Sequence, residues 1–282
     1  MRALIISFVL TMLTFFNSYG QVKITTTVKP IADIVKEISK DKADVSYIIP
    51  PNVNFHLYEY KSSDIKKISE SDLFLYIGSG EPNITGIVKN IPKDKAVKIS
   101  SLKGLVLIRE EDHPDEIHPA LWLDPYNAKV IAKFMTDYLS QKDPKNKDFY
   151  NKNYQKFSQN IDTIINYGNE KLSKVKNKNF VSYHYEFPYF IARFGLKYLA
   201  EIEMGHGREP TPKHLLDVIQ KIKLNNVKAI FTSKQFYNKK VLDLIVSKTG
   251  VKIIFLDSQG ENPTYLDMMR YNIDKVYEGL NY

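Results

Sequence analysis

The chain of 282 residues contains no cysteine. This absence excludes disulfide bonds, cysteine nucleophiles and thiolate metal sites. The sequence also lacks a dense arginine-rich block, because its formal net charge of +8 comes from lysines dispersed among acidic residues. Nucleic-acid-binding proteins usually carry a clustered basic face, so we expect no nucleic-acid partner. Several enzyme motifs are missing too: there is no GxSxG nucleophile elbow, no phosphate-binding glycine loop and no GxGxxG dinucleotide motif.

What the chain does contain is enough apolar sequence to fold. Hydrophobic residues make up 43% and aromatic residues 12% of the sequence, which is typical of a globular protein. A chain of this length is able to form two lobes that each bury a core of their own.

The N-terminus has the pattern of a secretory signal peptide. Met1 and Arg2 precede an almost wholly apolar stretch over 3–16, and Ser18 and Gly20 are small residues at the −3 and −1 positions of a cut after Gly20. The apolar stretch is short for a membrane span. No cysteine follows it that would take a lipid anchor, and no later segment is apolar for long enough to cross a membrane. We therefore expect residues 1–20 to be removed and the mature chain to be soluble in the periplasm.

Beyond the leader, segments rich in β-branched residues alternate with amphipathic segments of helical period. Strands are expected at 22–28, 45–49, 73–77, 180–183, 198–202, 229–232 and 252–256. Helices are expected at 30–38, 62–69, 127–139, 188–194, 212–224, 239–249 and 265–279. Alternation of this kind predicts parallel sheets flanked by helices.

A longer helix is expected between the two halves. Apolar residues recur at helical spacing from Asp143 to about Lys174 with no proline after Pro144, a length of roughly 45 Å at 1.5 Å per residue. Such a helix is long for one small lobe and suits a connector. We predict an α/β fold of two lobes, each with a mainly parallel sheet flanked by helices, joined by one long connecting helix. The predicted ranges are 21–142 for the N-terminal lobe, 143–176 for the connecting helix and 177–282 for the C-terminal lobe.

Metal-ligating side chains follow several of the predicted strands. His56, His184 and His206 each come after a strand, and Asp257 comes directly after the strand at 252–256. Ligands of such sheets bind beyond the carboxyl ends of the strands. Imidazole and carboxylate are what zinc takes in a site without sulfur. The residues lack the close spacing of a zinc finger or of an HExxH helix, so an ordinary role as hydrogen-bonded loop histidines stays open.

Two of the other histidines, His113 and His214, are expected to be solvated. His214 falls in the first turn of a predicted helix.

Several segments, in order along the whole mature chain, resemble motifs of the zinc- and manganese-binding receptors of ABC importers. Residues 49–65 are similar to the family's PPGxxPHxYEPxPSDI segment, and Leu121–Pro125 to its HxWLDP motif. Residues 182–196 are similar to HDAFGYFxxxYGL, Glu209–Pro212 to EPSP, and 256–272 to the end of the family's sequences.

The resemblance implies two α/β lobes bridged by a long helix, with one metal ion bound between them. It also implies the function of an extracytoplasmic solute-binding protein, which captures a divalent transition metal and delivers it to the permease and ATPase of an ABC importer. No covalent bond is broken in that process, so we predict no enzyme activity. The family's first, third and fourth ligands correspond to His56, His184 and Asp257. Some members instead use the glutamate that corresponds to Glu209.

The second ligand departs from the family pattern. The family's histidine two residues before Trp122 is Ala120 in this chain, and the nearest histidine is His118. In an extended segment a shift of two residues keeps the same face and moves the ring by about 6.6 Å. We predict that His118 takes the ligand's place, with Glu209 or His206 as substitutes. Three imidazoles favour Zn²⁺, whereas Mn²⁺ or Fe²⁺ is the alternative if an oxygen ligand replaces a nitrogen.

Three other functions remain open from the sequence. A secreted zinc-dependent hydrolase would use the same ligands with an open position for water, and would need a general base. Glu59, Glu186 and Glu209 are candidates for that base. The chain is alternatively a degenerate member of the family that no longer binds metal tightly, or an adhesin-like surface protein.

Overall fold

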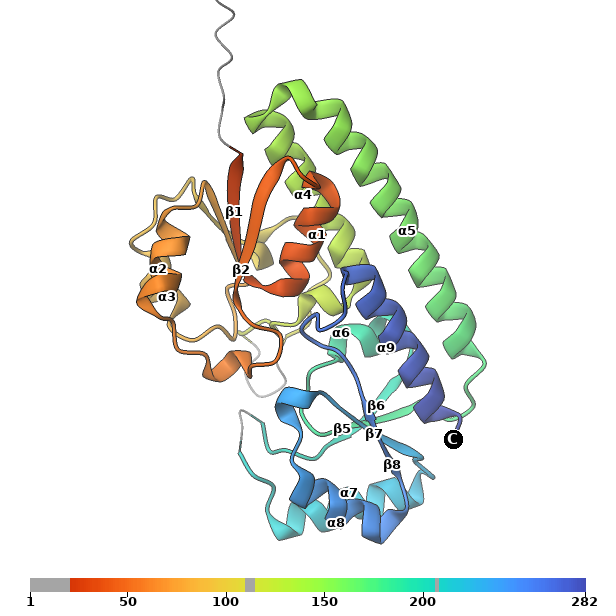
Figure 1. Cartoon of the computed structure of the whole chain (residues 1–282). Coiled ribbons are helices and arrows are strands. Elements are labelled where there is room, and N and C mark those ends of the chain that lie inside the picture. The colour runs from red at the N-terminus through yellow and green to blue at the C-terminus, as the bar shows by residue number, and fades with distance from the viewer. Residues whose placement is uncertain (1–20, 110–114, 206–207) are drawn as a thin grey trace, which may run out of the picture.

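The computed structural model describes residues 21–109, 115–205 and 208–282. The predicted leader and the histidines His113 and His206 lie outside the described residues. The chain forms two four-stranded sheets, in the orders β2-β1-β3-β4 and β6-β5-β7-β8, and every strand pairing within them is parallel (Figure 1).

Helices flank the N-terminal sheet, and the first of them packs directly on its first two strands. Its strands are β1 (Val22–Val28), β2 (Ala43–Ile49), β3 (Leu73–Tyr76) and β4 (Ala96–Lys98), and its helices are α1 (Lys29–Ser39), α2 (Ser62–Ser69), α3 (Ile84–Val88) and α4 (Pro125–Lys142). Proline in the first turn suits the start of α1 because its fixed φ is helical and its missing N–H would have no partner there. The apolar positions of that helix then recur every three or four residues and are fully buried.

The C-terminal sheet is built in the same way. Its strands are β5 (Asn179–Ser182), β6 (Lys197–Glu201), β7 (Ala229–Thr232) and β8 (Lys252–Phe255), and its helices are α6 (Pro188–Arg193), α7 (Pro212–Leu224), α8 (Lys239–Thr249) and α9 (Tyr265–Leu280). Parallel strands need crossover connections, which α6, α7 and α8 supply, whereas α9 follows the last strand.

One long helix, α5 (Lys147–Ser173), runs beside both lobes (Figure 1). Its 27 residues span about 40 Å, and a short 3₁₀ turn at Pro144–Asn146 precedes it. It buries Phe157, Ile161 and Leu172. Helix α9 lies along it, and the rings of Phe157 and Tyr265 are 6.2 Å apart.

The predicted fold class of two α/β lobes with parallel sheets and one long helix is confirmed. The sequence patterns missed β4 and α3, which have only three and five residues.

Buried contacts fasten the lobes to each other in addition to the long helix. Arg193 of α6 donates two hydrogen bonds, of 2.6 and 2.7 Å, to the carboxylate of Asp124 at the start of α4. The Trp122 indole N–H donates to the Ser258 carbonyl at 2.7 Å, and the Tyr265 hydroxyl donates to the Trp122 carbonyl at 2.7 Å. One continuous apolar core includes buried residues of both lobes. The two lobes are thus held as one body.

Within the described residues, no helix combines the length and the apolar character that a membrane crossing requires.

Candidate metal centre

Loops that follow strands of both sheets meet around one small cavity between the lobes. From the N-terminal lobe it is lined by His56, His118 and Trp122, and from the C-terminal lobe by His184 and Glu186, among others. Its volume is about 20 Å³. A space of roughly 10–15 Å³ is enough for one water molecule, so the cavity has room for a single small ligand and no more.

His56 lies in the 3₁₀-helix η1 (Phe55–Leu57), which follows β2 and the proline turn after it. The side chain of Asn54 caps this turn by accepting the His56 backbone N–H at 3.0 Å. The neighbouring Phe55 is buried edge-on against Trp122, with ring centroids 6.5 Å apart. The cap and the buried neighbour together place the His56 ring 5.6 Å from the His184 ring, centroid to centroid.

His118 is buried, with 4% of its surface exposed, and bridges the lobes through its ring. Its Nε2–H donates to the Tyr185 carbonyl at 2.8 Å, and its Nδ1 accepts the Ala120 backbone N–H at 3.3 Å. Burial is the main reason why the pKa of His118 falls to about 3, and the nearby His184 and His56 lower it further against the Tyr185 hydrogen bond. His118 is therefore neutral, which is the form that binds metals.

His184 follows β5 and stacks on the ring of Phe236 at 4.0 Å. Its Nδ1–H donates to Glu203 at 2.6 Å, and the Nδ1 lies 3.6 Å from a Glu201 oxygen. Burial by itself lowers the pKa of His184, but the Glu203 hydrogen bond and the charges of Glu186 and Glu201 outweigh burial and raise the pKa above its usual value.

His184, Glu201 and Glu203 offer three ligand atoms within 4.8 Å of one another, the only group this compact in the part of the chain that the structure describes. The three histidines line one cavity, but their ring nitrogens do not all lie within 4.8 Å of one another. The candidate metal site is the cavity rather than the group of His184, Glu201 and Glu203, because Glu203 already accepts the hydrogen bond of His184 and Glu201 accepts the Tyr185 backbone N–H.

Glu186 is a fourth polar side chain of the cavity. It is buried, and its two carboxylate oxygens accept hydrogen bonds from the Ser258 hydroxyl at 2.5 Å and the Ser233 hydroxyl at 2.6 Å. Burial raises the pKa of its carboxyl group, against the lowering effects of His184 and of the two serines.

The other predicted site residues lie apart from the cavity. Asp257 is buried, but its oxygens accept hydrogen bonds from the loop that follows it, and it does not line the cavity. Glu209 is exposed and does not line it either. His214 is half-buried and its Nε2–H donates to the Glu201 carbonyl at 2.9 Å, so it is less solvated than expected. His206 lies outside the described residues.

Glu203 and Glu201 were not predicted from the sequence. Both lie at the carboxyl end of β6, the position that drew attention to His206. Applying the same strand-end rule to carboxylates as well as imidazoles would have found them.

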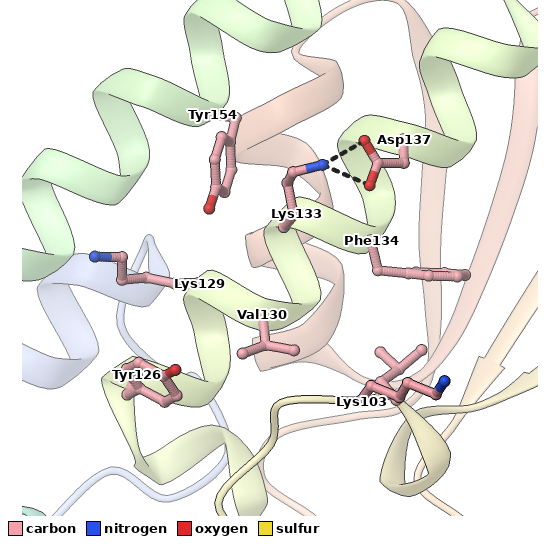
Figure 2. A pocket seen from close by; sticks show the side chains of 9 residues that line it. Lys103, Tyr126, Lys129, Val130, Lys133, Phe134, Asp137 and Tyr154 are labelled. Atoms are coloured by element: carbon pink, nitrogen blue, oxygen red, sulfur yellow. Dashed lines mark hydrogen bonds and ion pairs between the residues drawn. The ribbon is translucent and has the colours of Figure 1, made fainter.

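A larger hollow of about 410 Å³ lies over the outer face of α4 (Figure 2). It is lined by lysines, tyrosines and apolar side chains, and its carboxylate, Asp137, is paired with Lys133 at 2.6 Å. Because ammonium groups repel cations and Asp137 is already paired, this hollow is not a metal site.

The fold has two α/β lobes with parallel sheets, joined by a long helix, and imidazoles from both lobes meet at the boundary. This is the architecture of the two-lobed extracytoplasmic receptors for metal ions. The chain belongs to the family described as the periplasmic component A of the zinc-uptake complex, ZnuA, whose model matches residues 24–279. The resemblance stated from the motifs is thereby confirmed.

Similar proteins are named for different metals. The chain is 30% identical to the manganese ABC transporter substrate-binding lipoprotein PsaA of Streptococcus pneumoniae, over 94% of this chain and 91% of that protein. It is 28% identical to the high-affinity zinc uptake system protein ZnuA of Bacillus subtilis, over 91% of this chain and 87% of that protein. A crystal structure of ZnuA superposes with a TM-score of 0.82 over 93% of this chain and 99% of that one, at 23% identity.

Proposed function

We propose that the mature protein captures one divalent transition metal ion, zinc in the first place, between its lobes and delivers it to the permease and ATPase of an ABC importer. The observation that supports this most is the small cavity lined by His56, His118 and His184, which come from both lobes. Neutral imidazoles are good zinc ligands. A metal ion held by all three would link the lobes and signal that the receptor is loaded.

The hydrogen bonds of the site indicate how each histidine would bind. Because Nδ1–H of His184 is donated to Glu203, its other ring nitrogen is left for the metal, as in the carboxylate–histidine–zinc arrangement. His118 would exchange the Tyr185 carbonyl for the metal if it binds through Nε2. Loading would then replace one link between the lobes by another, with a small approach of the three rings.

Such a change would stay local. The Arg193–Asp124 pair and α5 join the lobes away from the cavity, and the Trp122–Ser258 hydrogen bond joins them at the cavity wall. We therefore expect loading to rearrange the loops around His118 and Tyr185 rather than to swing one lobe against the other. The membrane partner would recognise that loop rearrangement.

No covalent chemistry is part of this function, so the protein is proposed not to be an enzyme. A zinc hydrolase fits the site less well, because a cavity of about 20 Å³ has no room for a substrate beside a metal ion.

Zinc is proposed over manganese and iron because three imidazoles and few oxygens suit zinc, whereas manganese prefers carboxylate-rich sites. The relatives named above include receptors for both metals.

For the maturation and layout of the chain we propose export with cleavage near Gly20, and lobes at 21–142 and 177–282 with a connector at 143–176. The positions of the strands support this division, since β1–β4 end at Lys98 and β5 begins at Asn179.

Calorimetric titration of the mature, metal-stripped protein tests the proposed function. We expect one zinc ion to bind per chain, with a proton release that grows as the pH falls, because protons compete with the metal for His184, whose pKa the neighbouring carboxylates raise. Failure to bind zinc, manganese or iron would refute the receptor function and favour a degenerate relative.

A further inference from the structure

The family motif and the geometry of the cavity assign the oxygen ligand of the metal site to different residues. The motif points to Asp257, which lies two residues after the end of β8. Among the residues that the structure describes, however, the one carboxylate that lines the cavity with the three histidines belongs to Glu186. The motif HDAFGYF, which residues 184–190 resemble, has alanine where this chain has Glu186.

The hydrogen bonds of the two carboxylates differ in number. An ionised carboxylate offers about four lone-pair sites. Asp257 accepts four hydrogen bonds, from the backbone N–H groups of Gln259, Gly260 and Asn262 and from the Asn262 side chain, at 2.7–3.1 Å. Its acceptor capacity is thus filled by the loop that it organises, and turning toward a metal would break that loop.

Glu186 accepts only two hydrogen bonds from the described residues, one on each oxygen, from Ser258 and Ser233. Each oxygen therefore keeps a lone pair with which to bind a metal while the serines hold the group in place. Its seat is also rigid, because Ser233 is buried directly after β7 and the Ser258 carbonyl accepts the Trp122 indole N–H of the other lobe.

Charge supports the same choice. Three neutral imidazoles leave a bound dication with its full charge in a buried space, which is costly without an anion in contact with it. The carboxylates of Glu203 and Glu201 lie behind His184 and do not line the cavity. Glu186 brings one negative charge to the wall of the cavity and is itself buried without a cationic side chain bonded to it.

We infer that Glu186 is the oxygen ligand of this site and that Asp257 instead braces the loop 257–262. The inference rests on the proposed function and specifies its ligand set as His56, His118, His184 and Glu186. Three nitrogens and one oxygen complete a four-coordinate site of the kind that zinc prefers.

The absence of cysteine from the chain allows a direct test. A thiol introduced by Glu186→Cys would be the only sulfur able to form a thiolate bond, and a thiolate bound to Co²⁺ gives a charge-transfer absorption band. We expect this band in Co²⁺-loaded Glu186→Cys and not in Asp257→Cys. A band in Asp257→Cys, or no band in Glu186→Cys, would overturn the inference.

Affinity provides a second test that does not depend on a new ligand. Glu186→Gln keeps an oxygen for the serines and removes the charge, so zinc affinity should fall by more than roughly tenfold. Asp257→Asn should keep zinc affinity near that of the wild type while lowering the unfolding temperature of the metal-free protein. Glu70→Gln removes an exposed carboxylate outside the site and serves as the matched control.

The outcomes separate this inference from the proposed function. If the wild type binds no metal, both fall. If the wild type binds zinc and Glu186→Gln binds it equally tightly, the receptor function stands and the role of Glu186 is refuted. Far-ultraviolet circular dichroism of each metal-free variant verifies that an affinity change is not a loss of folding.

Discussion

Glu203 is predicted to set the strength of metal binding through His184 without touching the metal. Its carboxylate accepts the His184 Nδ1–H at 2.6 Å and is buried, with 8% of the side chain exposed. This bond fixes the tautomer of the ring and its orientation, and the negative charge makes the opposite nitrogen a better ligand. Replacement of Glu203 should therefore weaken zinc binding even though no ligand is lost.

The size of the effect follows from the nature of the bond. Loss of such a partner typically costs about 10- to 100-fold in metal affinity, which is about 1.4–2.7 kcal/mol. Glu203→Gln keeps an oxygen that accepts the Nδ1–H and removes only the charge, so we expect about tenfold. Glu203→Ala also removes the orientation and should approach about 100-fold.

The pH dependence gives the prediction a second readout. Because Glu203 raises the pKa of His184, protons compete with the metal for this ring in the wild type as the pH falls. Glu203→Gln lowers that pKa and weakens the competition. The affinity deficit of the variant should hence be largest near pH 8 and shrink toward pH 6.

The assay is competition with a zinc-chelating indicator at both pH values, with Glu70→Gln as a control at an exposed glutamate outside the site. Wild-type affinity in Glu203→Gln at pH 8 would refute the reasoning, as would a deficit that grows as the pH falls. A loss well beyond about 100-fold would exceed what the partner of a ligand accounts for and would also contradict this role.

Three further predictions concern stability. His118 has a pKa of about 3 when folded and about 6.5 when unfolded, so its contribution to stability is fully present above pH 6.5 and declines as the pH falls toward 3. In urea titrations at pH 5, the free energy of unfolding of the metal-free wild type should have fallen by about 2 kcal/mol through His118, a loss that His118→Gln should not show. Equal losses in the two proteins would contradict the lowered pKa of His118. Asp124→Asn keeps the cap of α4 but leaves Arg193 without its charged partner, so it should lower the free energy of unfolding by about 2–3 kcal/mol. An effect below about 1 kcal/mol would show that this pair does not hold the lobes together tightly. Gly80→Ala should lower the free energy of unfolding by about 1–3 kcal/mol, because the φ of Gly80 is +73° and a Cβ there would lie 2.9 Å from Pro119 and 3.0 Å from Phe55. Since both neighbours lie in loops that carry proposed ligands, the variant should also bind zinc more weakly. Gly86→Ala, which has open space around it, is the control and should be neutral or stabilising.

Most of the fold could be predicted because its signals are local. The apolar faces of α1 and α5 recur at helical spacing, and the buried strands are short β-branched or aromatic runs between turns. Strand β4 and helix α3 escaped because three and five residues are too few to show a period. The fastening of the lobes by Asp124 and Arg193 joins residues 69 positions apart and leaves no local pattern.

The candidate site could be predicted in part. The rule that ligands gather at strand ends led to His56 and His184, which the structure brings to one cavity. His118 was reached only through the motif, and it lines the same cavity although its place in the motif is shifted. The direction in which a carboxylate points depends on the loop N–H groups that surround it, as at Asp257. No local sequence pattern specifies the positions of those N–H groups.

The most direct test of the central claim is X-ray absorption spectroscopy at the zinc edge on the loaded mature protein and on His118→Ala. The account predicts three imidazoles and one oxygen at about 2.0–2.1 Å from zinc in the wild type, and two imidazoles in the variant. A shell of carboxylate oxygens with one imidazole would place the metal at His184, Glu201 and Glu203 instead and contradict the account. So would an imidazole count that the variant leaves unchanged.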